Sequence, residues 1–367
     1  MKNRAGNVII LCSFAVICSS WILWAIFGRF TDQTNHEKRL LAELPKFTIE
    51  NYETYAGSWN AYIDDNIPFR NELIKTYSAI DYYIFKRAID SNVIVGKAGW
   101  LFYLNNNDGY SKDDYLGKNL FSDEDLKKIE ENCTAFQKTL EEQGKEFILF
   151  IAPNKERIYS EYMPDQYGKP ADIYRTLQVV QYLRENTDIK VVYPYEELMR
   201  AKEKLGVDLY YKTDTHWNQV GGYIGACALL RELGIDMPDI NSKQINIKKT
   251  ELSDGDLSEM LGWGGKNINY FVEGYDRHSV ENLQWDFKTV IKYCTQESDA
   301  RKIFVIRDSF CSNMAEYIGS QFSSSCMTYK YHYWFNDLVE YNPDVVVLET
   351  VERYIGGLQD FKWNKQK

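Results

Sequence analysis

The longest continuous apolar stretch of the chain covers residues 8–27, which contain no charged side chain. At about 1.5 Å of rise per residue, a helix of this length crosses a bilayer core of roughly 30 Å. Lys2 and Arg4 precede the stretch, which favours a cytoplasmic N-terminus. Trp21 and Trp24 are typical of an interfacial anchor rather than of a cleavage site. We therefore predict a single-pass cell-membrane anchor, with the rest of the chain outside the cytoplasm.

The hydrophobic pattern changes after this anchor. Residues 29–95 are polar and rich in tyrosine, and they are predicted to form helical turns between the membrane and a folded domain. From residue 96 onward, short apolar runs alternate with segments of helical spacing, beginning with a first strand or hairpin arm at residues 99–103. The predicted parts are a cytoplasmic stub and transmembrane anchor at residues 1–28, a juxtamembrane helical segment at 29–95 and a folded domain at 96–367.

The clearest helix is predicted after Ser122, a good N-cap with Asp125 three residues later. Apolar residues then recur at helical spacing until Gly144 can end the helix. Residues 146–152 form a continuous apolar run, as expected for a strand buried on both faces of a parallel sheet. The alternation continues with a helix at 173–183 and strands at 190–193, 302–306 and 344–348. This order predicts an α/β fold with a mostly parallel sheet flanked by helices.

Charge and cysteine content narrow the function classes. The formal net charge is −10, so the chain lacks the basic surplus that binds nucleic acid, and no nucleic-acid partner is predicted. Two of the seven cysteines lie in the apolar stretch, and no pair has CxxC spacing. Neither a zinc ribbon nor a disulfide framework is indicated.

Residues 210–218 contain the first group of candidate catalytic side chains. If this segment is extended, Asp214 and His216 lie on the same side, because side chains alternate along a strand. A carboxylate that holds one histidine nitrogen leaves the other nitrogen available for acid–base work. Short Asp-x-His patterns also occur in ordinary polar loops, so this pair alone leaves both interpretations open.

Ser309 directly follows an apolar run, at a predicted turn from a strand into a helix. A hydroxyl at such a turn is exposed, and the N–H groups of the helix start point to where an oxyanion forms. The alternative is structural, with Ser309 or Asp308 acting as a helix cap. Because a second predicted strand end carries Asp214 and His216, the combination favours a serine nucleophile in acyl transfer.

Two motifs resemble those of a known family. Asp214-Thr-His-Trp217 and the turn Asp308-Ser309-Phe310 are similar to the signature of the alginate O-acetyltransferase and DHHW-motif family, a branch of the SGNH (GDSL) hydrolase superfamily. The resemblance spans most of residues 35–355, and the Asp-x-His pair precedes the serine as it does in that family. Further similar segments are residues 37–45, 65–70, 99–103, 152–155, 255–257 and 351–353.

The resemblance implies an SGNH-hydrolase-like fold in which Ser309 is the nucleophile, His216 the general base and Asp214 the residue that orients it. It implies an extracytoplasmic O-acetyltransferase that acts on a cell-surface or exported polysaccharide through an acyl-serine intermediate, without a cofactor. A membrane-bound O-acyltransferase partner would supply acetyl groups from cytosolic acetyl-CoA. No asparagine for the oxyanion hole is assigned, because Asn154 and Asn313 are only guesses, so this role is given to the backbone N–H of Ser309.

The chain departs from the family at Arg307, where glycine is frequent; the arginine would either crowd the oxyanion site or hold an anionic substrate. Trp217 and Tyr159 could stack on sugar rings, although aromatic residues are more often core. Lys155 and Arg353 could bind a carboxylate or phosphate, although surface pairing is the default for such cations. No metal site is predicted, since the spacing of the four histidines matches no ligand pattern.

Two alternative functions share these observations. A carbohydrate esterase would use the same three residues to deacetylate a glycan, with water as the acceptor. A non-catalytic glycan-binding or scaffold subunit of a polysaccharide assembly complex would not need the Ser309 hydroxyl. The exclusion of water, which separates a transferase from an esterase, depends on how loops pack around the site.

Overall fold

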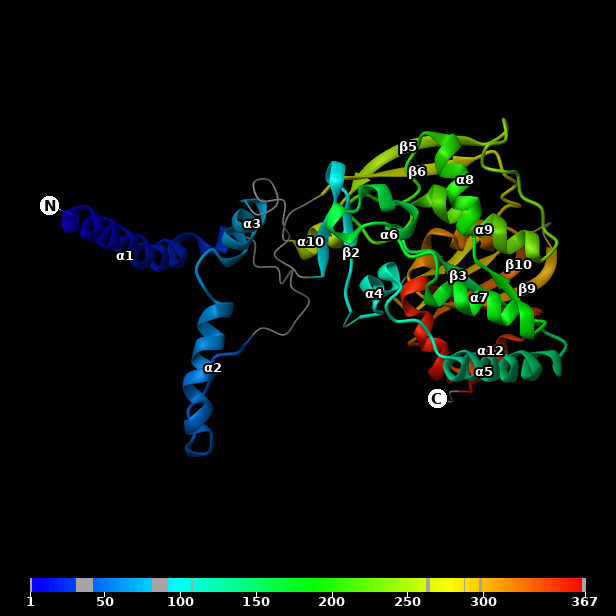
Figure 1. Ribbon diagram of the computed structural model, residues 1–367, viewed down its shortest axis with the longest axis horizontal. Helices are drawn as coiled ribbons and strands as arrows, with labels where there is room; N and C mark the ends of the chain where they lie inside the picture. The colour runs from blue at the N-terminus through cyan, green and yellow to red at the C-terminus, as the bar shows by residue number, and fades with distance from the viewer. Residues whose placement is uncertain are drawn as a thin grey trace. The chain divides into compact units, whose positions relative to one another are not determined.

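The computed structural model describes residues 2–30, 42–80, 92–106, 108–261, 265–286, 288–296 and 299–364 (Figure 1). The chain divides into two compact units. The first contains residues 1–90 and 258–264, and the second contains residues 91–257 and 265–367. The candidate site belongs to the second unit.

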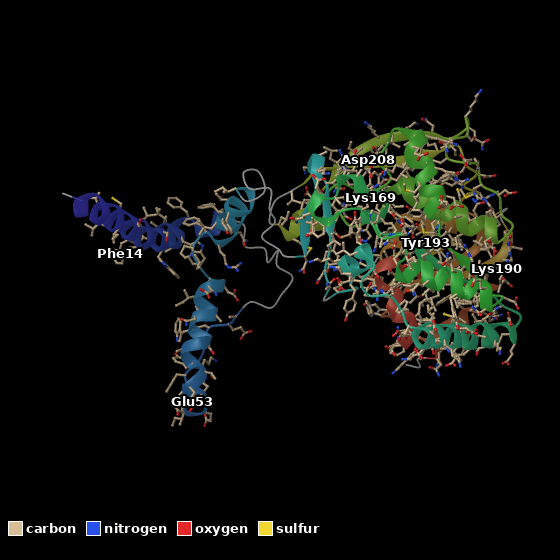
Figure 2. The ribbon with its side chains drawn as sticks, in the orientation of Figure 1. Phe14, Glu53, Lys169, Lys190, Tyr193 and Asp208 are labelled. Atoms are coloured by element: carbon tan, nitrogen blue, oxygen red, sulfur yellow. The ribbon has the colours of Figure 1, made fainter. Side chains whose placement is uncertain are left out.

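The first unit is helical in its described part, which contains α1 (Lys2–Phe27), η1 (Gly28–Phe30), η2 (Ile49–Asn51), α2 (Tyr52–Asp65) and α3 (Arg70–Ile80). The span Ile10–Phe27 of α1 has a mean hydropathy of 2.2, and its length and composition would let it cross a membrane, as those of a signal sequence would. Apolar side chains such as Phe14 project outward from α1 (Figure 2). Residues 31–41 and 81–91 of the predicted juxtamembrane segment lie outside the described residues.

A seven-stranded sheet with the order β4-β3-β11-β9-β10-β8-β7 forms the centre of the second unit. The five neighbouring strands β4, β3, β11, β9 and β10 run parallel. Strand β8 is antiparallel to β10, and β7 is antiparallel to β8. The prediction of a mostly parallel sheet is therefore confirmed. The strands are β3 (Glu146–Ala152), β4 (Lys190–Val192), β7 (Glu281–Trp285), β8 (Val290–Cys294), β9 (Asp299–Arg307), β10 (Phe322–Tyr329) and β11 (Val345–Val351).

Side chains of β3 alternate between two hydrophobic cores, one on each face of the sheet. Ile148 and Phe150 belong to the core that α8, α9 and α11 share, whereas Phe147 and Leu149 belong to the core of α5, α7 and α12 (Figure 1). This two-sided burial explains why the strand is a continuous apolar run. The helices of this unit are α4 (Ser111–Leu116), α5 (Asp123–Glu141), α6 (Lys155–Ile158), α7 (Arg175–Asn186), α8 (Tyr195–Leu205), α9 (Gln219–Glu232), α11 (Ala315–Gly319) and α12 (Phe335–Tyr341), while α10 (Asp256–Met260) begins in it.

Helix α5 begins where the sequence predicts. The Ser122 hydroxyl accepts a hydrogen bond from the backbone N–H of Asp125, and the Asp125 carboxylate accepts one from the backbone N–H of Ser122. The predicted capping box is confirmed. The predicted hairpin arm is also confirmed, because β2 (Leu101–Tyr103) pairs antiparallel with β1 (Val93–Val95). Strands β5 (Asn246–Ser253) and β6 (Asn267–Glu273) also pair antiparallel.

The carboxyl ends of four strands lie at the same edge of the sheet. There β3 leads to Asn154, β9 leads to Ser309, β10 leads to Lys330 and β11 leads to Glu352. Parallel open sheets collect functional loops at this edge, because all of their strands end there. The predicted position of Ser309 at a strand end is confirmed.

The prediction of a strand end for Asp214 and His216 is wrong. Residues 211–216 form irregular turns between Tyr210 and Trp217, which are joined by an isolated antiparallel bridge, and the N–H of Tyr211 donates to the carbonyl of His216. The loop folds back on itself across that bridge, and α9 follows it directly, with Asn218 as its N-cap. Side-chain contacts rather than a sheet ladder must therefore hold this loop in place.

Candidate active site

The turn at Ser309 is held by the carboxylate that precedes it. Asp308 accepts a hydrogen bond from the backbone N–H of Phe310 at 2.9 Å, and its second oxygen accepts one from the N–H of Val351 at 2.7 Å. Ser309 occupies the N-cap position of the 3-10 turn η7 (Phe310–Asn313), but its hydroxyl makes no capping bond. The capping role therefore belongs to Asp308, and the hydroxyl of Ser309 is available for another partner.

That partner is His216, which lies 93 residues earlier in the chain. The distance from His216 Nε2 to Ser309 Oγ is 2.7 Å, and the distance from His216 Nδ1 to Asp214 Oδ1 is also 2.7 Å. The backbone N–H of His216 donates to the same Asp214 oxygen at 2.8 Å. With Nδ1–H donating to Asp214, Nε2 is the acceptor for the Ser309 hydroxyl. The geometry therefore brings together all three predicted catalytic side chains.

A second carboxylate, Asp256, lies beside the histidine and was not predicted as a functional residue. It accepts hydrogen bonds from the backbone N–H and the hydroxyl of Thr215 at 2.8 and 2.6 Å, and its own N–H donates to Asp214 at 3.0 Å. Its carboxylate is 3.8 Å from His216 Nδ1. The preceding Gly255 permits this approach, since a Cβ there would lie 2.1 Å from a backbone oxygen of the loop. The sequence signal that could have identified Asp256 was its position in the segment 255–257, which resembles the family but was assigned no role.

The electrostatics of this group favour a histidine that gains a proton readily. Burial alone would lower the pKa of His216, but the charge and hydrogen bond of Asp214, together with the charge of Asp256, outweigh it and raise the pKa above the ordinary 6.5. Burial would raise the pKa of Asp214, but His216 and hydrogen bonds to its carboxylate lower it well below its usual value. An ionised Asp214 thus stabilises the imidazolium that forms when His216 takes a proton.

The buried side chain of Lys155 hydrogen-bonds to the loop of residues 211–216. Its ammonium group donates to the backbone carbonyls of Tyr211, Lys212 and Asp214 at 2.9, 3.1 and 2.8 Å. The residue is only 3% exposed, so this placement argues against the predicted contact with substrate. Burial lowers the pKa of Lys155 to about 7, although the nearby charges of Asp214 and Asp256 oppose the shift. Three simultaneous donors require the protonated amine.

The two aromatic residues predicted to stack on sugars are also buried. Tyr159 is 2% exposed, and its hydroxyl accepts a hydrogen bond from the N–H of Leu209 at 2.7 Å. Trp217 is fully buried, and its indole N–H donates to the backbone carbonyl of Phe310 at 2.8 Å. Their placement favours a structural role over sugar stacking, because a polymer cannot reach them. Trp217 also joins the His216 loop to the serine turn.

The two arginines near Ser309 differ in their surroundings. Arg307 is fully buried, and its guanidinium donates to the carbonyls of Met327 and Asp308. The guanidinium of Arg307 therefore packs against the backbone of the serine turn. Because it does not face solvent, it cannot hold a substrate from this position. Arg353 is 9% exposed, and its guanidinium carbon lies 5.3 Å from the centre of the Phe310 ring. The Nε of Arg353 has no hydrogen-bond partner among the described residues.

The backbone N–H of Ser309 donates to no acceptor within the described residues. It therefore has the free donor that an oxyanion hole needs. The side-chain amide of Asn313 donates to the carbonyl of Trp217 at 2.6 Å, so it is already used. Asn154 is 2% exposed, and its backbone N–H donates to the Glu352 carboxylate at 2.9 Å.

Asp214, His216 and Asp256 are close enough to be considered as a metal site, since one ligand atom of each lies within 4.8 Å of the others. The hydrogen bonds described above already account for these atoms. A metal on Nδ1 of His216 would also displace the bond that orients the ring toward Ser309. The arrangement is therefore better suited to proton transfer than to metal binding.

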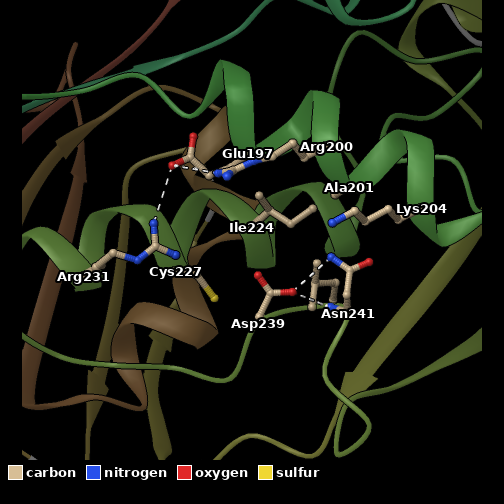
Figure 3. Close-up of a pocket in the computed structure, with 10 residues that line it drawn as sticks. Glu197, Arg200, Ala201, Lys204, Ile224, Cys227, Arg231, Asp239 and Asn241 are labelled. Carbon is tan, nitrogen blue, oxygen red and sulfur yellow. Dashed lines mark hydrogen bonds and ion pairs between the residues drawn. The ribbon is translucent and has the colours of Figure 1, made fainter.

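A separate pocket of about 480 Å³ lies between α8 and α9 and is shown in Figure 3. Glu197 lies within 4 Å of both Arg200 and Arg231 there, and Asp239 accepts a hydrogen bond from Asn241. Its charged side chains are thus largely matched with one another. Ser309 and its partners do not line it.

The family model for the SGNH hydrolase-like domain of the acetyltransferase AlgX matches residues 93–306, which is more than half of the chain. The chain belongs to this AlgX-type SGNH family. The matched range contains Asp214 and His216 and ends three residues before Ser309. The resemblance of the chain to this family is thereby confirmed.

Two relatives of this AlgX-type chain are named probable alginate O-acetylase AlgJ. The one from Pseudomonas fluorescens is 24% identical over 268 residues, covering 71% of this chain and 61% of the relative. The one from Pseudomonas putida is 27% identical over 186 residues, covering 47% of this chain and 42% of the relative. The chain thus spans less than two thirds of the length of either relative.

Solved structures show that the AlgX-type fold is shared more widely. PatB1 of Bacillus cereus has a TM-score of 0.53 at 15% identity, covering 74% of this chain and 99% of the solved one. A DHHW family protein from Eubacterium siraeum has a TM-score of 0.50 at 13% identity, covering 75% of this chain and 99% of the solved one. At these identities the likeness concerns the fold alone.

Proposed function

We propose that this chain is an extracytoplasmic O-acetyltransferase that acetylates a cell-surface or exported polysaccharide through an acetyl-serine intermediate. The observation that supports the proposal most directly is the hydrogen-bonded series from Asp214 through His216 to Ser309, at the carboxyl edge of the sheet. This arrangement occurs in a chain of the AlgX-type family, whose relatives include probable alginate O-acetylases. The residues therefore have both the geometry and the family context for acetyl transfer.

In the first half-reaction, the Ser309 oxygen attacks the carbonyl carbon of an acetyl donor while His216 Nε2 accepts the hydroxyl proton. The negative charge of the tetrahedral intermediate develops on the carbonyl oxygen, which the free N–H of Ser309 stabilises. Asp214 stabilises the imidazolium without taking its proton. When the bond to the leaving group breaks, His216 returns the proton to it, and Ser309 keeps the acetyl group as an ester.

In the second half-reaction, a sugar hydroxyl attacks the acetyl-serine carbonyl. His216 Nε2 now accepts the proton of that hydroxyl and passes it to the Ser309 oxygen as the ester bond breaks. The products are an acetylated sugar and free Ser309. An esterase would follow the same steps with water in place of the sugar, so the exclusion of water decides between the two outcomes.

The proposed organisation places an anchor at residues 1–28, a juxtamembrane segment at 29–95 and the catalytic domain at 96–367. The apolar span of α1 supports a signal anchor with a cytoplasmic N-terminus. A membrane-bound O-acyltransferase would be the partner that supplies acetyl groups. Confinement beside that partner raises the effective concentration of the donor without any new contact.

The test is the intact mass of the full chain, held in detergent micelles, after brief exposure to an activated acetyl ester. We expect wild type to gain one acetyl group, Ser309→Ala to gain none, and His216→Ala to react far more slowly. If wild type neither gains the group nor turns over the ester, the proposal is wrong, and a non-catalytic glycan-binding or scaffold role becomes the better account.

Transfer and hydrolysis are separated by adding an acceptor glycan to the acetylated protein. A transferase should lose its acetyl group faster when glycan is present, with acetyl appearing on the sugar. A carbohydrate esterase should lose it to water at the same rate with or without the glycan. The partition of acetyl between sugar and water is measured by mass spectrometry.

A further inference from the structure

A pocket of about 600 Å³ lies at the carboxyl edge of the sheet, close to the serine turn. Its walls come from the turn before α4, from the segment after β10 and from the segment η8 (Glu352–Asp360) after β11. Figure 1 shows α4 beside this C-terminal segment. Its lining includes Gly109, Tyr110, Arg175, Lys330, Tyr331 and Arg353.

Two of these residues connect the pocket to the nucleophile. Arg353 lies over the ring of Phe310, the residue that follows Ser309, at 5.3 Å. The backbone N–H of Lys330 donates to the carbonyl of Arg307, two residues before Ser309, at 2.8 Å. The pocket therefore begins next to the turn that carries the nucleophile. Ser309 itself is not among the lining residues.

The pocket is cationic, although the whole chain has a net charge of −10. Its lining contains four cationic side chains and one carboxylate. Asp360 already pairs with Lys128 and Arg175 with Asp114, which leaves Lys330, Arg353 and Lys362 as the cations that give the pocket its charge. Among the described residues, no carboxylate oxygen lies within 4 Å of the Lys330 ammonium or the Arg353 guanidinium. Burial opposes the shift, but the charges of Asp308 and Glu156 raise the pKa of Arg353 from a greater distance. Arg353 is nine-tenths buried and has an Nε that no described residue accepts from. A buried donor without a partner is costly, so this donor points to a ligand with acceptor oxygens.

Exposed aromatic rings lie beside these cations. Tyr110 is 52% exposed and Tyr331 is 69% exposed, although aromatic side chains are usually covered. The Lys330 ammonium is 5.4 Å from the ring of Tyr331 and 4.1 Å from that of Tyr354. Flat apolar rings next to hydrogen-bonding groups suit a pyranose, which has an apolar face and a polar edge.

The Tyr110 side of the pocket is rigid. The Arg175 guanidinium donates to the carbonyl of Gly109 at 2.9 Å and is paired with Asp114 at 2.6 Å. Gly109 has a φ of 77°, and a Cβ there would lie 2.8 Å from the carbonyl oxygen of Arg353. Only glycine fits this close contact at such a φ. A wall that is ordered before binding loses less entropy when a ligand arrives.

We propose that this pocket is the acceptor subsite, and that it takes a glycan unit bearing a carboxylate or a phosphate. Lys330 and Arg353 bind the anionic group, and the rings of Tyr110 and Tyr331 stack on the sugar. The role of the pocket as acceptor subsite rests on the proposed function, but binding of the anionic glycan needs no chemistry at Ser309.

The test is calorimetric binding to the full chain in detergent micelles, with Ser309→Ala as the parent so that no transfer occurs. The probes are three oligosaccharides of equal length, one neutral, one made of hexuronate units and one carrying phosphate groups. We expect at least one anionic oligomer to bind about tenfold or more tightly than the neutral one, with an affinity that falls as salt rises. The better anionic probe identifies the carboxylate or the phosphate as the recognised group.

Two substitutions in the parent then locate the binding. Lys330→Gln should weaken the anionic oligomer about tenfold and reduce its salt dependence, while Arg353 retains the remainder. Tyr331→Ala should weaken anionic and neutral oligomers by similar factors, because stacking does not depend on charge. The matched control is Lys190→Gln, at the opposite edge of the sheet, which should change nothing. Thermal unfolding midpoints establish that each variant is folded.

The outcomes are distinguishable from those of the proposed function. If acetyl-serine forms on wild type but neutral and anionic oligomers bind equally, the subsite proposal is overturned while acetyl transfer stands. Unchanged anionic binding in Lys330→Gln would overturn it in the same way. If no acetyl-serine forms but the anionic preference and its loss in Lys330→Gln are both observed, the pocket is a glycan-binding site in a non-catalytic protein.

Discussion

The two halves of the candidate site are held by different means. The serine turn follows β9, whose position is set by backbone pairing with β10 and β11 on either side. The loop with Asp214 and His216 has no such ladder. It depends on Lys155 and Asp256, whose side chains form hydrogen bonds with its backbone. The nucleophile is therefore placed by the sheet and the base by a few buried side chains. Damage to those side chains should misplace the base and leave the serine turn intact.

The largest effect is expected from the base itself. His216→Ala removes the proton acceptor for Ser309, and we expect turnover of an activated acetyl ester to fall by roughly 10³-fold or more. The serine turn keeps its contacts with Val351 through Asp308 and with the Trp217 indole, so the folded structure should persist. Steady-state kinetics and circular dichroism measure the two properties. A loss of less than about tenfold would show that His216 is not the base.

Lys155→Met should have the next largest effect. The substitution keeps the bulk of the side chain but leaves three backbone carbonyls without their donor, so the loop should shift. A displacement of about 1 Å can cost roughly 100-fold in rate, and we expect kcat to fall by that order while KM changes little.

The matched control for this substitution is Lys145→Met. Lys145 is also buried, but it donates to Asn342 at the far edge of the sheet. Both variants should lose stability, and only Lys155→Met should lose activity out of proportion to its unfolding midpoint. Equal losses of activity in the two variants would contradict a role for Lys155 in placing the base.

Asp256→Asn should have a moderate effect with a distinctive pH dependence. His216 works as a base only when Nε2 is unprotonated, so activity should fall as pH drops through its pKa, which lies above 6.5. Asp256 is one of the charges that raise this pKa, so its removal should move the acidic limb to lower pH. We also expect about a tenfold loss of rate from weaker positioning of the loop. The measurement is the pH profile of kcat/KM, and an unmoved or higher acidic limb would contradict the assignment.

Trp217→Phe should have the smallest effect on rate, because it changes the contact between the two halves rather than either half. It removes the indole donor to Phe310 and leaves a buried carbonyl unpaired, at a cost of about 1–3 kcal/mol in the free energy of unfolding. Activity should fall only severalfold in the folded protein. Denaturant unfolding gives the first quantity and steady-state kinetics the second; an unchanged stability would show that this contact is replaceable.

Much of the fold was predictable because its signals are local. The apolar run of β3 and the capping box of α5 are properties of a few neighbouring residues, and both are confirmed. The turn at Ser309 was predictable for the same reason, since an apolar strand leads directly into it. The loop of residues 210–218 was not, because its alternation of polar and apolar residues suits a strand, while tertiary contacts hold it as turns.

The sequence by itself determined the elements, the family and the types of side chain that acyl transfer requires, because these depend on spacing and identity along the chain. The tertiary structure alone decided which charged and aromatic groups are available to a substrate. Lys155, Trp217 and Arg307 are buried with their donors already used, whereas Arg353 keeps a free Nε. It also decided that Asp256, 42 residues from Asp214, joins the site. Burial and hydrogen-bond partners arise from contacts between distant segments, and periodicity and spacing along the chain do not encode those contacts.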